Sequence, residues 1–114
     1  MQRTIEQMRT DIPPGTLYLL ILKTLSAGPL HGYGIARHIK RLSEEVLRIE
    51  EGSLYPALQR MLVKGWVTSE WVQAGPKRRA RVYRLTASGR KQLATEVSTF
   101  TRAIEAIMRV IQPA

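Results

Sequence analysis

The chain has 114 residues, enough for one domain but not for a catalytic domain beside a separate binding domain. It contains no cysteine, which excludes disulfides, thiolate metal sites and a cysteine nucleophile. Lys and Arg number 18 against 9 Asp and Glu, giving a net charge of +9. On so small a protein this charge favours a polyanionic partner, which is nucleic acid or, less readily, an anionic membrane surface.

No segment directs the chain to a membrane. The longest apolar run, Leu17 to Leu22, is far shorter than the roughly 20 residues of a membrane-spanning helix. The first residues lack the apolar stretch of a signal peptide. We therefore expect a cytoplasmic protein with no membrane partner.

Two helices are predicted in the first half of the chain. Residues 1–14 end in Pro13-Pro14, which stops a helix, so they are interpreted as an N-terminal arm. Residues 16–25 are apolar on most sides, which predicts a helix buried on more than one face. Residues 32–42 form a second helix, whose apolar positions recur at helical spacing: Ile35, Ala36, Ile39 and Leu42.

A third helix is predicted to begin near Gly52-Ser53 and to end before Gly65. Ser53 is the expected N-cap, and Pro56 fits the first turn because its missing N–H would be unpaired there. One apolar stripe is expected to lie in the core: Leu54, Leu58, Met61 and Leu62. The residues left facing away from that stripe are Ser53, Tyr55, Pro56, Gln59, Arg60 and Val63.

A basic hairpin should follow. Residues 66–72 and 81–85 carry strand-favouring side chains, and residues 73–80 between them contain a Gly75-Pro76 turn signal. From Val72 to Thr95 there are basic residues but no acid. Trp66 and Trp71 are interpreted as aromatic residues of the core or of an interface, in preference to a ligand-binding platform.

The last predicted helix follows Thr86, a candidate N-cap, and runs to about residue 111. Its apolar residues are spaced alternately four and three apart, as in a coiled-coil seam: Leu93, Val97, Phe100, Ile104, Ile107 and Ile111. Because a core this small cannot cover such a seam, we expect it to pack against a second copy of the chain.

This order of elements predicts a mainly α fold with a small β-hairpin: a winged helix-turn-helix with a long C-terminal helix. In that plan the third helix enters the major groove of DNA. Gln59 suits adenine, and Arg60 suits guanine if it points inward. Ser53 and Tyr55 suit phosphates near the helix start, and the basic residues of the hairpin suit phosphates or the minor groove.

Other classes of function find less support. His31 and His38 lie seven apart without further ligands nearby, so no metal or other cofactor is expected, and His31 is interpreted as ordering the turn before the second helix. No phosphate loop, paired acidic motif or catalytic triad pattern indicates an enzyme. The rival hypotheses are a winged-helix module that docks onto another protein without a specific DNA site, and an RNA-binding winged helix.

Three segments resemble the PadR family of transcriptional regulators: Gly28-Pro29-Leu30-His31-Gly32-Tyr33-Gly34-Ile35, Glu51-Gly52-Ser53-Leu54-Tyr55-Pro56-Ala57-Leu58 and Val82-Tyr83-Arg84-Leu85-Thr86-Ala87-Ser88-Gly89. The single C-terminal helix is similar to that of the small subfamily. The resemblance implies a dimeric DNA-binding regulator, usually a repressor, with the first and last helices forming the dimer and with Tyr33, Ser53 and Tyr55 at the DNA. Ser53 replaces the commoner Thr, and Gly34 replaces a commoner Glu whose contact is therefore not carried over.

We therefore expect a homodimeric repressor that binds double-stranded DNA at a palindromic operator, with domains at 1–14 (arm), 15–86 (winged helix-turn-helix) and 87–114 (dimerisation helix). Neither the operator nor any small-molecule inducer is identified by the sequence. The expected DNA-contacting residues are Tyr33, Arg37, Ser53, Tyr55, Pro56, Gln59, Arg60, Lys77, Arg78, Arg79 and Arg81. The expected dimer contacts are Leu17, Leu20, Ile21, Leu93, Val97, Phe100, Ile104, Ile107 and Ile111.

Overall fold

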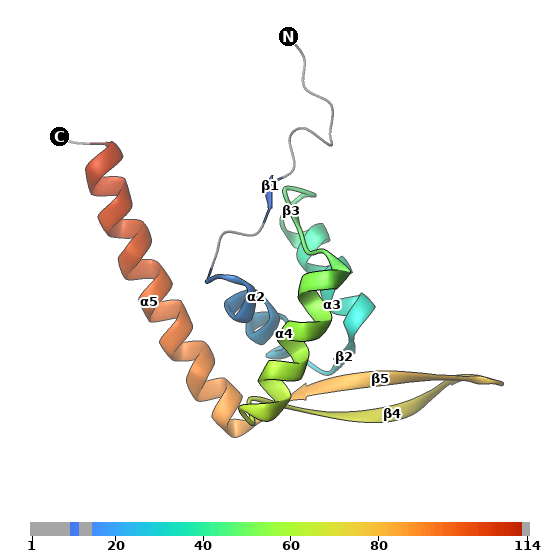
Figure 1. Cartoon of the computed structure of the whole chain (residues 1–114). Helices are drawn as coiled ribbons and strands as arrows, with labels where there is room; N and C mark the ends of the chain where they lie inside the picture. The colour runs from blue at the N-terminus through green and yellow to red at the C-terminus, as the bar shows by residue number, and fades with distance from the viewer. Residues whose placement is uncertain (1–9, 12–14, 113–114) are drawn as a thin grey trace, which may run out of the picture.

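The computed structural model describes residues 10–11 and 15–112, and it has the predicted winged helix-turn-helix with a long C-terminal helix (Figure 1). Three helices, α2 (Leu17–Leu25), α3 (Gly32–Leu42) and α4 (Glu51–Val63), pack beside a three-stranded antiparallel sheet. The sheet has the order β2 (Leu30–His31), β5 (Arg78–Leu85), β4 (Val67–Gly75). Most of the predicted arm, 1–14, lies outside the described residues; β1 (Thr10–Asp11) pairs in parallel with β3 (Leu47–Arg48).

The predictions for α2 and α3 are confirmed to within a residue at their ends. His31 is the N-cap of α3, and its Nδ1 accepts a hydrogen bond from the backbone N–H of Gly34 at 3.0 Å. The imidazole thereby satisfies one of the free amide groups at the start of the helix. The prediction that His31 orders this turn is confirmed.

The start of α4 differs from the prediction. The N-cap is Glu50, in an extended conformation, and the backbone N–H of Ser53 already bonds to the Glu50 carbonyl at 3.0 Å. Ser53 is therefore inside the first turn and is not the N-cap, and Pro56 lies inside the helix beyond that turn. The helix begins at Glu51, just ahead of the predicted start near Gly52-Ser53, and Gly52 is already its second residue. At the other end, Gly65 has φ +77° and follows the helix as predicted.

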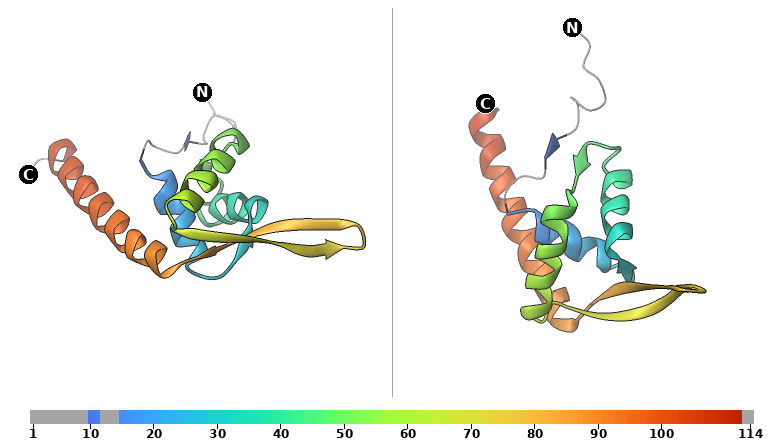
Figure 2. Two further views of the ribbon diagram at one scale, coloured as in Figure 1. Left: turned by 60° about the horizontal axis from the view of Figure 1, so that its bottom comes forward. Right: turned by 45° about the vertical axis from the view of Figure 1, so that its right-hand side comes forward.

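The hairpin is longer than predicted, and only Pro76-Lys77 remains in the turn between its strands. Cross-strand pairing extends to Gln73 with Arg79 and, after an irregularity in register, to Gly75 with Arg78. Residues 78–79, expected in a loop, are therefore held in a strand. Figure 2 shows this hairpin, the wing, extending away from the helices as a narrow ribbon.

The core lies where the three helices meet the base of the sheet. The α4 stripe is confirmed as core at Leu54, Leu58 and Met61, whereas Leu62 is half-buried. Leu42, predicted on the apolar face of α3, is instead 67% exposed, because it is the last residue of the helix and lies beyond the packed turns. The other fully buried large side chains are Ile21, Leu22, Leu25, Ile35 and Val67.

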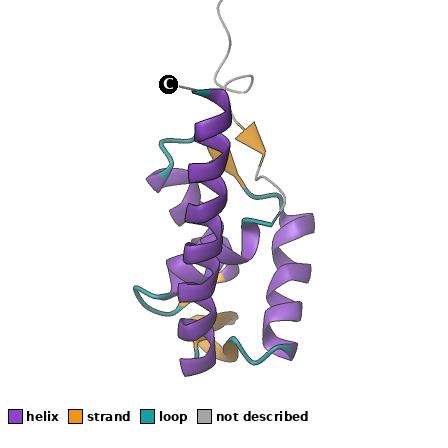
Figure 3. Cartoon of the chain, turned by 90° about the vertical axis from the view of Figure 1, so that its left-hand side faces the viewer, coloured by secondary structure: helices purple, strands orange, loops and turns teal. Residues whose placement is uncertain are grey.

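The C-terminal helix α5 (Ala87–Ile111) diverges from the domain on the side opposite to the wing (Figures 1 and 3). Its N-cap is Thr86, as predicted, whose Oγ1 accepts the Gly89 N–H at 3.0 Å. Gly89 is buried against the carbonyl of Trp66, where an added Cβ would lie 2.1 Å from that oxygen. This close approach sets the point at which α5 leaves the domain. None of the described helices is long and apolar enough to cross a membrane.

Candidate nucleic-acid interface

A groove of about 610 Å³ lies between the start of α3, the helix α4 and the wing. It brings together five of the predicted DNA-contacting residues: Tyr33, Tyr55, Gln59, Arg78 and Arg81. It also includes Trp71, which sequence reasoning did not assign to DNA. Residues distant in sequence thus form one surface that combines aromatic rings, arginines and an amide.

The α3 side of the groove is formed by Tyr33, which is exposed and stacks on His31 with ring centroids 6.3 Å apart and planes at 6°. The guanidinium of Arg37 lies 5.6 Å from the centre of the Tyr33 ring. Because a cation is attracted to the face of an aromatic ring, this contact holds a positive charge beside the tyrosine. Tyr33 and Arg37, predicted separately, therefore form one unit.

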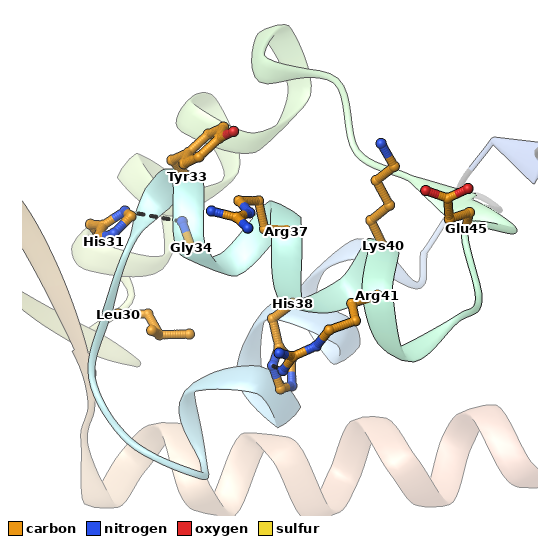
Figure 4. Close-up of a pocket in the computed structure, with 9 residues that line it drawn as sticks. All are labelled: Leu30, His31, Tyr33, Gly34, Arg37, His38, Lys40, Arg41 and Glu45. Atoms are coloured by element: carbon orange, nitrogen blue, oxygen red, sulfur yellow. Dashed lines mark hydrogen bonds between the residues drawn. The ribbon is translucent and has the colours of Figure 1, made fainter.

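A second groove of about 620 Å³ follows α3 (Figure 4). Its lining includes Arg37 and two basic residues that sequence reasoning missed, Lys40 and Arg41, with Glu45 as the acidic residue. A terminal nitrogen of the Arg41 guanidinium lies 3.4 Å from Nδ1 of His38, so this guanidinium is turned along the helix toward the preceding turn. The helical period of α3 places these basic side chains on the face away from its buried residues, and the sequence alone contains this signal.

The α4 side of the groove depends on a close contact between Tyr55 and Gly32. A Cβ added to Gly32 would lie 2.8 Å from Cε1 of Tyr55, so any larger residue at position 32 would force the Tyr55 ring to move. Gln59 follows Tyr55 by one turn and lines the same groove. Ser53 and Pro56 are exposed on α4 but are not among the residues that line it.

Arg60 is directed elsewhere. Its Nε donates a hydrogen bond to the Tyr18 hydroxyl at 2.6 Å, and its guanidinium lies 5.7 Å from the centre of the Tyr18 ring. Tyr18 belongs to α2 and meets the edge of Trp66 at 5.4 Å. Arg60 is not among the residues that line the groove, and the condition for pairing with guanine, that it point inward, is not met because its guanidinium lies against Tyr18 on α2.

The wing has two unlike faces. On the face that continues the core, Arg79 and Arg81 lie 5.5 Å and 6.0 Å from the centre of the Trp71 ring. On the opposite face Arg84 pairs with Glu70 at 3.6 Å, which offsets its charge. The positive charge of the wing is thus concentrated on one face and at the turn, where Lys77 is exposed.

Tyr83 anchors the base of the wing and is buried. Burial raises the pKa of its hydroxyl above the ordinary 10.0, and this effect outweighs the neighbouring Arg81, which lowers the pKa. A tyrosine is neutral at physiological pH even with its ordinary pKa, so this hydroxyl does not offset the positive charge of the groove.

The predicted seam of α5 is exposed in the single chain. Val97, Phe100, Ile104, Ile107 and Ile111 are 39% to 63% exposed, whereas Leu93 packs against the core. On α2, Leu17 and Leu20 are half-buried, but Ile21 is 0% exposed. The expectation of Ile21 as a dimer contact is therefore corrected, because its side chain is used entirely within one chain.

No three His, Cys, Asp or Glu side chains gather as a metal site within residues 10–11 and 15–112. The grooves described here are lined mainly by aromatic and basic groups, a chemistry that suits an anionic surface.

Comparison with known proteins shows what this arrangement resembles. The family model described as "Transcriptional regulator PadR-like family" matches residues 21–95. The chain is 30% identical over 73 residues, or 64% of its length, to the negative transcriptional regulator PadR of Bacillus subtilis. It spans 23% and 40% of the length of two curated relatives that it matches and 92% of a third.

Solved structures agree with this match. A transcriptional regulator from Clostridium thermocellum is 26% identical and superposes with a TM-score of 0.81, covering 86% of this chain and 95% of its own. Bacillus subtilis PadR in complex with operator DNA is 28% identical with a TM-score of 0.68, covering 75% of this chain and 48% of its own.

Proposed function

The chain belongs to the PadR-like family of transcriptional regulators, and on this premise we propose that it is a sequence-specific binder of double-stranded DNA that represses transcription as a homodimer on a palindromic operator. The observation that carries the proposal is the groove between α3, α4 and the wing, where aromatic and basic side chains from three elements meet. The solved Bacillus relative, whose fold is similar, is a complex with operator DNA.

In this proposal α4 is the recognition helix. The major groove of B-DNA, about 12 Å wide, admits one α-helix, and a glutamine side chain pairs with both the N6 and the N7 of adenine. Gln59 is exposed on α4 at the groove and is the proposed base reader. Tyr33 and Tyr55 present hydroxyls suited to phosphates, and Ser53 and Pro56, both exposed on α4, are the remaining proposed contacts of this helix.

The wing and α3 supply most of the charge. The proposed phosphate contacts are Arg37, Lys77, Arg78, Arg79 and Arg81, with Lys40 and Arg41 added from the second groove. Contacts of this kind release counterions from DNA, so affinity should fall steeply with salt. Arg60 is omitted because Tyr18 holds its guanidinium.

Dimerisation is proposed to bury the seam of α5. Residues 15–86 then form the DNA-binding unit, and residues 87–114 form the dimerisation helix, of which 113–114 lie outside the described part. Exposed apolar side chains repeat along this helix at coiled-coil spacing, and the half-buried Leu17 and Leu20 on α2 extend the surface. Two-fold symmetry of the protein would then be matched by a palindrome in the DNA.

The dimer has a direct test. Ile104→Glu places a charge within the seam and should give monomers in sedimentation velocity, because a buried unpaired charge is strongly unfavourable. Ser98→Glu adds the same charge on an exposed residue of α5 outside the seam and should leave the dimer intact. If Ile104→Glu stays dimeric while folded, the interface lies elsewhere.

The proposed function is tested by selecting bound sequences from random duplex DNA at about 150 mM salt, near physiological ionic strength. We expect a motif with two-fold symmetry, which would also identify candidate operators. Recovery of no motif by the folded dimer would contradict sequence-specific binding and favour a docking module. Placing the recovered operator upstream of a reporter gene then distinguishes repression from activation.

A further inference from the structure

Trp71 is a large aromatic residue, 59% exposed, on a part of the wing that does not belong to the core. In the antiparallel register it lies directly opposite Arg81, and the adjacent pairs on this face are Gln73 with Arg79 and Ser69 with Tyr83. Side chains alternate between the two faces of a strand, so these residues share the face that begins with the buried pair of Val67 and Leu85. Neither packing in the core nor the recognition helix explains a tryptophan here.

Arg81 is held in place by several contacts on this face. Its guanidinium lies 6.0 Å from the centre of the Trp71 ring and 5.8 Å from that of Tyr83. Its Nε donates a hydrogen bond to Oγ of Ser69 at 2.9 Å. That bond uses one of the five N–H donors of the guanidinium. Arg81 is therefore oriented before any ligand arrives, with most of its donors uncommitted by this bond.

Arg79 depends more strongly on the tryptophan. Its guanidinium lies 5.5 Å from the centre of the Trp71 ring, and the arginine itself is exposed near the end of the wing. A long exposed side chain loses rotamer freedom when it binds, and a contact that limits this freedom beforehand reduces the loss. Arg84, on the other face of the wing, pairs instead with the carboxylate of Glu70.

We propose that Trp71 is a positioning residue for DNA binding: it holds the guanidinium groups of Arg79 and Arg81 over its ring, so that the wing meets a phosphate backbone with two arginines already placed. The inference rests on the proposed function, because it assigns the wing to DNA. It adds a neutral residue to the binding machinery and predicts which face of the wing is turned to the DNA.

The test uses the full chain and a fluorescein-labelled 30-base-pair duplex of arbitrary sequence, since phosphate contacts do not depend on base sequence. Affinities are measured by anisotropy at several salt concentrations for Trp71→Ala, Trp71→Phe, Arg79→Gln and the double variant Trp71→Ala/Arg79→Gln. A cation–aromatic contact at an exposed site corresponds to about a two- to fivefold effect. Trp71→Ala should therefore weaken binding by about that factor. Trp71→Phe should keep most of the wild-type affinity, because an aromatic ring remains.

The decisive quantity is the coupling between the two sites. Arg79→Gln should weaken binding less in the Trp71→Ala background than in the wild type, because the arginine is already misplaced there. Arg84→Gln, on the opposite face, is the matched control, and its effect should be the same in both backgrounds. Thermal midpoints of all variants are compared first; if Trp71→Ala does not fold, Trp71→Leu replaces it, since leucine is apolar but lacks the ring.

Each result decides the inference. Independent effects of Trp71 and Arg79, or equal coupling of Trp71 to Arg79 and Arg84, would overturn the positioning role. Equal weakening by Trp71→Ala and Trp71→Phe would also overturn it, because the ring face would not be the feature that matters. A wild-type chain that binds this duplex but yields no selected motif would contradict sequence specificity alone, and one that binds no duplex would remove the proposed function and this inference together.

Discussion

Gly89 is the position where one added methyl group should have the largest effect relative to its size. A Cβ at this residue would lie 2.1 Å from the Trp66 carbonyl oxygen, 2.7 Å from Cδ1 of Leu85 and 3.0 Å from the Trp66 carbonyl carbon. Even close C–H···O contacts keep about 3.3 Å between carbon and oxygen. Because the carbonyl is backbone, Gly89→Ala requires the start of α5 or the start of β4 to move by about 1 Å.

The loss of stability in Gly89→Ala is estimated from the contacts that such a movement disturbs. Overpacking a filled site costs about 1–3 kcal/mol. The Trp66 carbonyl also accepts the Thr86 N–H at 3.0 Å, and the loss of such a hydrogen bond costs about 1 kcal/mol. Alanine favours the helix over glycine by up to about 1 kcal/mol, which offsets part of the loss. We expect Gly89→Ala to lower the free energy of unfolding by about 2 kcal/mol.

Urea unfolding followed by circular dichroism, at one fixed protein concentration, measures this value. Gly52→Ala is the matched control, because Gly52 is also in the first turn of a helix but an added Cβ meets no atom within 4 Å. That change should raise the free energy of unfolding by up to about 1 kcal/mol. If Gly89→Ala is as stable as the wild type, the close approach of α5 to Trp66 is not a constraint and the reasoning fails.

Three further predictions concern the groove and the wing. Gln59→Ala should weaken binding to the selected operator by about 1–3 kcal/mol and leave binding to arbitrary DNA unchanged, as measured by competition titration; equal losses on both DNAs would exclude Gln59 as a base reader. Lys77→Gln should reduce the slope of log affinity against log salt by about one unit, since one phosphate contact is removed, and an unchanged slope would exclude the turn from the interface. Burial raises the pKa of Tyr83 above 10.0. The contribution of the protonated Tyr83 hydroxyl to stability is therefore complete below pH 10 and is lost as the pH rises through the higher folded-state pKa. The free energy of unfolding should fall more steeply above pH 10 in the wild type than in Tyr83→Phe, and parallel curves would contradict this.

Local sequence patterns were sufficient for the helices and for the coiled-coil seam. Helices α2, α3 and α5 follow from apolar spacing, and the start of α5 follows from the N-cap at Thr86, because helical hydrogen bonds join residues only four apart. The seam of α5 follows from the same periodicity. These features depend on neighbours along the chain and are therefore present in the sequence itself.

The features that the sequence left undecided depend on partners far away in the chain. The length of the wing is set by pairing between residues 67–75 and 78–85, and this pairing places Arg78 and Arg79 in a strand instead of a loop. The direction of Arg60 is decided by Tyr18, which is 42 residues away.

The candidate site shows the same division. The sequence by itself determined which residue types occur on α4 and on the hairpin, and hence that Tyr55 and Gln59 face away from the core. Only the tertiary structure decided that Trp71 lies against Arg79 and Arg81, that Tyr55 fits over Gly32 and that Ile21 is unavailable to a partner. The physical reason is that spacing along the chain determines which side of an element a residue occupies, whereas its contacts depend on how separate elements pack together.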